Sequence, residues 1–169
     1  MSKIKVVVAG VGNCCSALVQ SVHYHAENPK GLMNYDLGGL KPSDIKVVGG
    51  IDIDSRKVGR DLSEAIFAEP NVAPRFCNPP PAGVVVVKGP VLDGADGVLK
   101  DVIQVDSAPP VDVPSYLEEL DAEILVCLLP TGAQKAVEFY ADSALKAGYA
   151  FINCTPAKIA SDNRWVESF

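Results

Sequence analysis

The stretch Val6-Val7-Val8-Ala9-Gly10-Val11-Gly12-Asn13-Cys14-Cys15 combines a short, continuous apolar run with two closely spaced glycines. Continuous apolar runs rich in β-branched residues are typical of strands buried on both faces of a parallel sheet. The residues that follow have helical spacing, with Cys15, Leu18, Val19 and Val22 at i, i+3, i+4 and i+7. The stretch therefore predicts a strand at 6–9, a tight turn, and a helix over 14–25.

Four further apolar runs of the same kind lie at residues 47–51, 84–87, 124–128 and 150–152. Helical spacing recurs at 133–147 and ends at Gly148, a suitable left-handed C-cap, and Pro114 can open a helix that runs to Leu120. A last helix begins with Ser161 or Asp162 as its N-cap. Strands and helices that alternate in this way predict a doubly wound, mainly parallel α/β sheet, the Rossmann-type fold.

Two segments interrupt this alternation. Residues 28–43 form a glycine-rich insertion between the first helix and the second strand, and residues 78–81 form a rigid polyproline connector. Neither resembles a domain linker, because strands of the same sheet are expected on both sides of each. We therefore expect residues 1–169 to be one domain.

The composition excludes several classes of protein. The 169 residues include 15 Lys and Arg against 21 Asp and Glu, and the chain is 48% hydrophobic, which favours a globular domain over disorder. The acidic balance disfavours binding to nucleic acid or to anionic membranes, and no apolar run approaches the roughly 20 residues of a spanning helix. Met1 and Ser2 lead directly into the first strand, so no signal peptide is expected, and the five cysteines have neither disulfide nor metal spacing. We expect a cytoplasmic protein without a metal site.

The two glycines after the first strand belong to a pattern that is typical of one kind of binding site. Gly10, Gly12 and Cys15 occupy the three small positions of the pattern G-x-G-x-x-(G/A). The first glycine permits a tight turn, the second lets the backbone approach a diphosphate, and the helix start offers free N–H groups. This placement predicts dinucleotide binding, with a plain strand-to-helix turn as the alternative.

An acidic residue ends the second apolar run. Asp52 lies further from Gly12 than the usual ~20 residues, and the glycine-rich insertion accounts for the excess. A carboxylate here would accept hydrogen bonds from the adenosine ribose and repel a 2′-phosphate, which favours NAD over NADP, although Arg56 and Lys57 could offset that repulsion. The alternative is that Asp52 only caps the next helix, for which Asp54 and Ser55 are better placed by sequence.

Two turns follow later strands, at residues 129–132 and 153–156. Ligands of open α/β sheets bind at the carboxyl ends of strands, so these small and polar residues could contact a cofactor, or simply form turns. His23 and His25 are two residues apart in one helix and face different ways, which argues against a metal pair and against a Ser/His/Asp triad.

Taken in chain order, these motifs resemble one family, the inositol-3-phosphate synthases (myo-inositol-1-phosphate synthases) of the bacterial and archaeal type. The resemblance includes the glycine turn and the unusual insertion, and it leaves out only residues 110–113 as a stretch without a match. The matching stretches are 8–14, 31–33, 57–68, 89–94, 129–132, 151–156 and 159–162.

The resemblance implies an NAD-dependent isomerase that converts D-glucose 6-phosphate to 1D-myo-inositol 3-phosphate without net redox change. In that family NAD⁺ oxidises C5, the ketone acidifies C6, an intramolecular aldol step closes the ring, and NADH reduces the product. The resemblance further implies that this chain is the NAD-binding part, inactive alone, and that a catalytic domain beyond Phe169 carries the catalytic lysines and builds a homotetramer.

The resemblance also implies which residues contact the cofactor, while it assigns no catalytic residue within this chain. These positions are Gly10, Gly12, Asn13, Cys14, Asp52, Asp61, Thr131, Gly132, Asn153 and Thr155. Two other hypotheses remain open on the sequence. One is an NAD(P)-dependent dehydrogenase of another substrate, and the other is a non-catalytic module that binds a dinucleotide.

Overall fold

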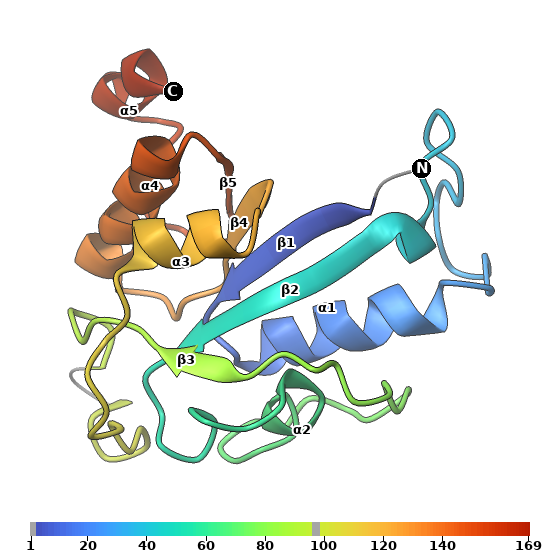
Figure 1. Ribbon diagram of the computed structural model, residues 1–169, viewed down its shortest axis with the longest axis horizontal. Coiled ribbons are helices and arrows are strands. Elements are labelled where there is room, and N and C mark those ends of the chain that lie inside the picture. Colours follow the sequence, from blue (N-terminus) through green and yellow to red (C-terminus); the bar gives the residue numbers. More distant parts are fainter. Residues whose placement is uncertain (1–2, 96–98) are drawn as a thin grey trace.

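The computed structural model describes residues 3–95 and 99–169, so Met1 and Ser2, the expected direct entry into the first strand, lie outside the described residues. Within these residues, five parallel strands form one sheet in the order β3-β2-β1-β4-β5 (Figure 1). The strands are β1 (Ile4–Ala9), β2 (Ile45–Asp52), β3 (Val86–Lys88), β4 (Ile124–Cys127) and β5 (Ala150–Asn153). The doubly wound α/β fold predicted from the apolar runs is confirmed.

Helices cover both faces of the sheet, with α1 and α2 on one side and α3 and α4 on the other (Figure 1). The three helices predicted at 14–25, 114–120 and 133–147 are confirmed to within one residue at either end. Among the described residues, no helix has both the length and the apolar character needed to cross a membrane. The helical elements are α1 (Asn13–Tyr24), the 3-10 turn η1 (Pro42–Asp44), α2 (Leu62–Ala65), α3 (Val113–Glu119), α4 (Gln134–Ala147) and α5 (Asn163–Ser168).

β1 is the central strand, and its side chains alternate between the two helical layers. Val6 and Val8 pack with Cys15 on the side of α1, whereas Val7 and Ala9 pack among residues of α3 and α4. Because both faces of the strand are covered by helices from Val6 to Ala9, each of these four positions needs an apolar side chain, whereas Lys5, at the less buried start of the strand, pairs with Asp121. This is why the sequence of β1 does not alternate between polar and apolar residues.

The two segments that interrupt the alternation run outside the sheet. The glycine-rich insertion after α1 returns to the start of β2, at the end of the sheet opposite to the carboxyl ends of the strands (Figure 1), where Lys3 Nζ donates to the backbone oxygen of Ser43 at 2.6 Å. The chain just before the polyproline connector is held on α1 by the buried Gln20. Its Oε1 accepts from the N–H of Phe76, and its Nε2 donates to the oxygen of Pro74. Neither segment therefore intrudes on the carboxyl edge of the sheet.

Candidate functional site

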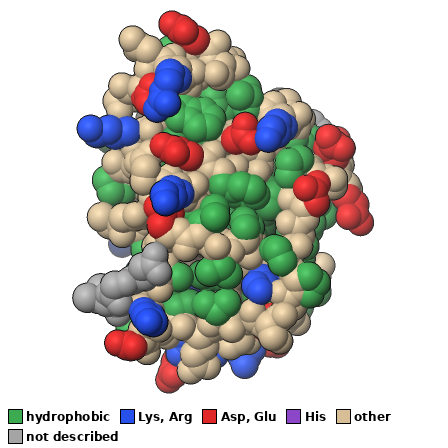
Figure 2. All heavy atoms as spheres, turned by 90° about the vertical axis from the view of Figure 1, so that its left-hand side faces the viewer, with side chains coloured by type: hydrophobic (Ala, Val, Ile, Leu, Met, Phe, Trp, Pro, Cys, Tyr) green, Lys and Arg blue, Asp and Glu red, His purple; other side chains and the backbone are tan. Residues whose placement is uncertain are grey.

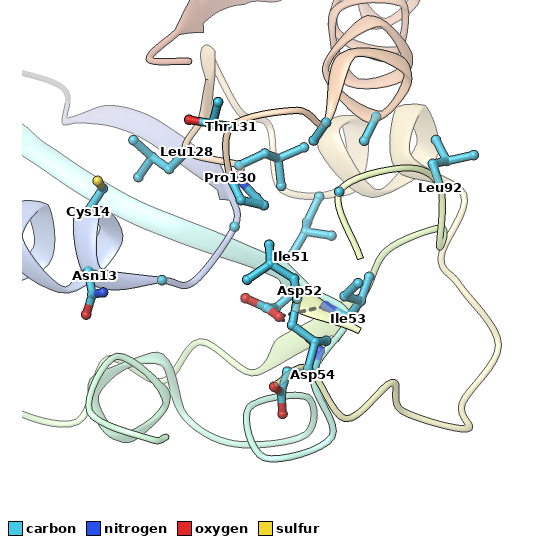
Figure 3. A pocket seen from close by; sticks show the side chains of 18 of the residues that line it. Asn13, Cys14, Ile51, Asp52, Ile53, Asp54, Leu92, Leu128, Pro130 and Thr131 are labelled. Carbon is cyan, nitrogen blue, oxygen red and sulfur yellow. Dashed lines mark hydrogen bonds between the residues drawn. The ribbon is translucent and has the colours of Figure 1, made fainter. Parts of the chain in front are cut away.

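The carboxyl ends of β1, β2 and β4 border a cavity of about 450 Å³. In parallel sheets these ends meet at one edge, where ligands of open α/β proteins bind, and the volume is in the range of small-molecule sites. Figure 2 views the molecule from the side on which the strands end, and hydrophobic side chains gather over the middle of that face. In Figure 3, Asp52 lies between Asn13 and Cys14 on one side and Leu92 on the other.

The two glycines of the turn are needed for different reasons. Gly10 has a φ of +93°, and a Cβ atom there would lie 2.9 Å from the backbone oxygen of Leu128, so packing and backbone both require glycine. Gly12 has an extended backbone with a φ of −92°, and a Cβ atom there would meet nothing within 4 Å. Neither backbone strain nor packing requires glycine at position 12. The absence of a side chain leaves open space beside the start of α1, and a ligand could approach the backbone closely there.

The start of α1 is not capped by a side chain. Gly12 is the N-cap residue, the first turn contains no acidic residue, and the first bond within the helix runs from the N–H of Ser16 to the oxygen of Gly12 at 2.9 Å. The N–H groups before Ser16 therefore have no partner within the helix, and with the helix dipole they favour an anion. The arrangement can accept a phosphate group.

Three neighbouring residues at this helix start behave differently. Asn13 lines the cavity, but its Oδ1 accepts from the N–H groups of Val72 and Ala73 at 2.7 and 2.9 Å. These bonds anchor the loop that follows α2 to the start of α1. Cys14 is exposed and also lines the cavity. Cys15 is fully buried against β1, and burial raises the pKa of its thiol to about 12. At the third small position of the motif, Cys15 thus serves helix–strand packing.

The Asp52 carboxylate is turned toward the glycine turn. Its Oδ2 accepts from the N–H of Val11 at 2.7 Å. Its Oδ1 accepts from the N–H groups of Ile53 and Asp54 at 2.7 and 2.9 Å (Figure 3). The side chain is 11% exposed and lines the cavity. Because a carboxylate has roughly four acceptor positions, these three bonds leave capacity for a ligand hydroxyl.

The alternative that Asp52 caps the next helix is wrong, and so is the expectation that Asp54 or Ser55 does so. The helix begins only at Leu62, because residues 55–60 form turns, and Asp61 is its N-cap. The Asp61 carboxylate accepts from Ser63 and from the N–H groups of Ala82 and Gly83. Burial opposes ionisation of Asp61, but these hydrogen bonds outweigh it and lower its pKa to about 2.

A buried polar network holds the glycine turn from its other side. Lys57 is 4% exposed, and its Nζ donates to Asn71 Oδ1 at 3.0 Å and lies 3.9 Å from Asp52 Oδ2. Asn71 Nδ2 in turn donates to the backbone oxygens of Val11 and Ile66, each at 3.0 Å. Both backbone polar groups of Val11 are therefore bonded to side chains, its N–H to Asp52 at the end of β2 and its oxygen to Asn71 further along the chain. No sequence motif indicated Asn71.

The turns after β4 and β5 contribute unequally to the lining of the cavity. Thr131 lines the cavity, and Gly132 follows it with a φ of +97°. Asn153 and Thr155 instead bond each other, with Asn153 Oδ1 accepting from the N–H of Thr155 at 3.0 Å and from its Oγ1 at 2.7 Å. Cys154, between them, lines the cavity.

The cavity therefore brings together six of the ten residues assigned to the cofactor by resemblance: Gly10, Gly12, Asn13, Cys14, Asp52 and Thr131. Gly132, Asn153 and Thr155 are sequence neighbours of lining residues, and Asp61 lies outside the lining. Contact of all ten with a cofactor stays a prediction.

Sequence reasoning missed the role of Asp93. Its carboxylate accepts from the N–H groups of Lys135 and Ala136, each at 2.8 Å, and so caps α4, whose own N-cap residue, Ala133, has no side-chain acceptor. The segment 89–94 is thereby fastened to α4, and Leu92 and Gly94 line the cavity. The sequence offered two signals here, the Asp-Gly pair at 93–94, which is typical of a turn, and the family resemblance over 89–94, and neither indicated a contact with α4.

The described residues, 3–95 and 99–169, contain no cluster of three or more His, Cys, Asp or Glu side chains suited to a metal ion. All five cysteines are free.

No protein-family model matches the chain. It is 44% identical over 99% of its length to an inositol-3-phosphate synthase from Mycolicibacterium smegmatis, and 41% and 40% identical to those from Mycobacterium tuberculosis and Corynebacterium glutamicum. The chain spans about half the length of these curated relatives, 47 to 48%.

Solved structures agree with this picture. The crystal structure of Ari2 matches 99% of this chain and 51% of its own, with a TM-score of 0.81 and 32% identity. A myo-inositol-1-phosphate synthase-related protein from Thermotoga maritima MSB8 matches 98% of this chain and 51% of its own, with a TM-score of 0.69, and at 21% identity it shows the fold alone. The resemblance read from the motifs is confirmed: the chain is homologous to the N-terminal part of the inositol-3-phosphate synthases.

Proposed function

We propose that the cavity at the carboxyl edge binds NAD, and that the chain supplies the NAD-binding part of an inositol-3-phosphate synthase that converts D-glucose 6-phosphate to 1D-myo-inositol 3-phosphate. The observation that carries the proposal is the empty space at Gly12 beside an uncapped helix start, with the Asp52 carboxylate next to the same turn. This combination provides for a diphosphate and a ribose hydroxyl at adjacent positions.

The residues present fit the cofactor. The open N–H groups at the start of α1 would hold the diphosphate, and the acceptor positions left on Asp52 would hold the adenosine ribose. Bound NAD would supply reversible hydride acceptance, which is the chemistry that an isomerisation without net redox change needs.

The charges around Asp52 favour NAD over NADP. A 2′-phosphate beside this carboxylate would be repelled, and Lys57, which could offset the repulsion, already donates to Asn71 and lies against Asp52. The names of the curated relatives favour a synthase over a dehydrogenase of another substrate and over a non-catalytic module.

The chain does not carry all the groups that the proposed reaction requires. Among the described residues that line the cavity, Lys57 is the one cationic side chain, and it is bound to Asn71. A sugar phosphate needs cationic partners, and ring closure needs an acid and a base. We therefore assign those groups to the part of the enzyme that corresponds to the remaining length of the relatives, so that residues 1–169 alone leave glucose 6-phosphate unconverted.

The proposal is tested by Gly12→Val and calorimetric titration with NAD. A Cβ atom at position 12 would meet no protein atom within 4 Å, so the thermal unfolding midpoint should stay near that of the unsubstituted protein, while NAD binding should be lost. Gly10→Val is the contrasting variant, since its side chain would clash with Leu128 and unfold the turn. NAD binding that is equal in Gly12→Val and the unsubstituted protein would overturn the proposed site.

A further inference from the structure

The second acidic residue after β2, Asp54, lies beside the cavity but does not face the glycine turn. In Figure 3 its carboxylate points away from that of Asp52. The side chain is 2% exposed and engages Arg56 through two bonds, with Arg56 Nε donating to Oδ1 at 2.9 Å and Nη2 donating to Oδ2 at 2.6 Å. Such bidentate pairing fixes the plane of the guanidinium, and each of its charge-assisted hydrogen bonds is stronger than one between neutral groups.

Arg56 is held by a third bond as well. Its Nη2 donates to the backbone oxygen of Val102 at 2.6 Å. The segment that contains Val102 is itself tied to the end of β2, because the N–H of Ser55 donates to the oxygen of Gln104 at 2.7 Å and that of Asp106 donates to the oxygen of Ile53 at 2.8 Å. The guanidinium is therefore confined between Asp54 and a fixed segment of backbone.

The position of Arg56 matters because its partner Asp54 is bonded directly to Asp52. The backbone N–H of Asp54 donates to Asp52 Oδ1 at 2.9 Å, while the Asp54 carboxylate holds the guanidinium, so Arg56 is attached next to the carboxylate proposed to hold the ribose. In agreement with this placement, hydrogen bonding to Asp54 is the main cause that raises the pKa of Arg56, and the charge of Asp52 makes a smaller contribution. An arginine at this end of the second strand is the side chain with which dinucleotide sites accommodate a 2′-phosphate. Here Arg56 is bonded instead to Asp54 and to the backbone oxygen of Val102.

We propose that Asp54 is a specificity-determining residue, which favours NAD over NADP by holding Arg56 away from the place of the 2′-phosphate. This inference rests on the proposed binding of NAD. In this proposal, two acidic residues share the discrimination between NAD and NADP. Asp52 repels the phosphate directly, and Asp54 removes the one neighbouring guanidinium, among the described residues, that could neutralise it.

The test is calorimetric titration with NAD and NADP of the unsubstituted protein, Asp54→Asn, Arg56→Gln and the double variant. Asp54→Asn keeps the shape of the side chain and weakens its hold on Arg56, so the affinity for NADP relative to NAD should rise by about tenfold, the worth of one charge-assisted hydrogen bond. The double variant should lose this gain. Arg56→Gln alone should leave the ratio unchanged, because Arg56 is not available to NADP in the unsubstituted protein. Asp106→Asn, which removes the same charge from a residue that does not contact Arg56, is the matched control.

The outcomes separate this inference from the function on which it rests. If the unsubstituted protein binds neither dinucleotide, the proposed function fails and takes the inference with it. If NAD binds but Asp54→Asn leaves the ratio unchanged, or the gain persists without Arg56, only the inference is overturned. Should Asp54→Asn fail to fold, Arg56→Gln decides: an unchanged affinity for NADP supports the inference, and a severalfold loss shows that Arg56 already serves the phosphate.

Discussion

The backbone N–H of Val11 donates to Asp52 Oδ2 at 2.7 Å, which joins the middle of the glycine turn to the end of β2. Next to it, the N–H of Gly10 donates to the backbone oxygen of Ile51 at 2.8 Å. The turn and the strand end are thus held together by two adjacent bonds. Asp52 both orients the turn and presents its remaining acceptor positions to the cavity, so substitutions there should change stability and ligand binding together.

Asp52→Ala should weaken NAD binding by about tenfold and narrow the gap to NADP, because it removes both the ribose acceptor and the charge that repels a 2′-phosphate. It should also lower the free energy of unfolding by about 1–3 kcal/mol, since the N–H of Val11 loses its acceptor. Calorimetric titration and urea unfolding measure the two effects. Asp52→Asn, which keeps an acceptor atom, should lose less stability, and equal affinity of the unsubstituted protein for NAD and NADP would rule out the assignment.

Asn71→Ala should destabilise the protein by about 1–3 kcal/mol, although the residue belongs to no motif. The substitution leaves the buried Lys57 ammonium without its Oδ1 acceptor, and it leaves the backbone oxygen of Val11 without a donor. Urea unfolding at neutral pH measures the change. Asn78→Ala, at an exposed position of the connector, is the matched control and should change stability little. Equal stability of the two variants would show that the network does not hold the turn.

Asp61 should make stability depend on acid pH. Its pKa in the folded protein is about 2, below the ordinary value of 3.8, so its contribution is fully present above pH 3.8 and is lost as the pH falls through about 2. Asp61→Asn should therefore flatten the fall in stability over this window, as followed by urea unfolding at a series of pH values. Glu118→Gln, at an exposed position of α3, should leave the profile of the unsubstituted protein in place. A profile of Asp61→Asn that coincides with it would contradict the prediction.

Apolar runs predicted the strands because the centre of this sheet is buried between helices, although β5 at its edge exposes Ile152. The runs did not predict which strands pair. The run at 84–87 was expected to form one strand, whereas β3 covers only residues 86–88. Val85 forms an isolated antiparallel bridge with Asp61, and the oxygen of Val84 accepts from the N–H of Leu62. These two valines therefore bond the chain before β3 to α2, and hydrophobicity alone does not distinguish that partner from β2.

The residues of the candidate site also differ in whether the sequence alone could predict them. The glycine turn and Asp52 could be predicted as lining residues because their proposed function follows from residue type and from position after a strand. Asn71 and Asp93 could not, since each acts on backbone groups far away in the sequence, at separations of 60 residues for Asn71 and Val11 and of 42 residues for Asp93 and Lys135. Such contacts exist only once the fold has brought these segments together.

Thiol labelling should distinguish adjacent cysteines. Cys14 and Cys154 are exposed, whereas Cys15 and Cys127 are buried, and burial raises their pKa values to about 12 and about 11. Because the thiolate is the reactive form, iodoacetamide at about pH 8 should modify Cys14 and Cys154 in the folded protein and leave Cys15 and Cys127 unmodified. Peptide mapping by mass spectrometry measures the labelling of each residue, and protein unfolded in urea should be labelled at all five cysteines.

NAD should slow the labelling of Cys14, because this thiol lines the cavity at the start of α1, where the diphosphate is proposed to bind. Cys77 lies outside the cavity lining and should be labelled at the same rate with and without NAD, which makes it the internal control. Gly12→Val should abolish the protection of Cys14, since its side chain occupies the space for the ligand. A rate of Cys14 labelling that saturating NAD leaves unchanged would show that the ligand does not lie against this helix start.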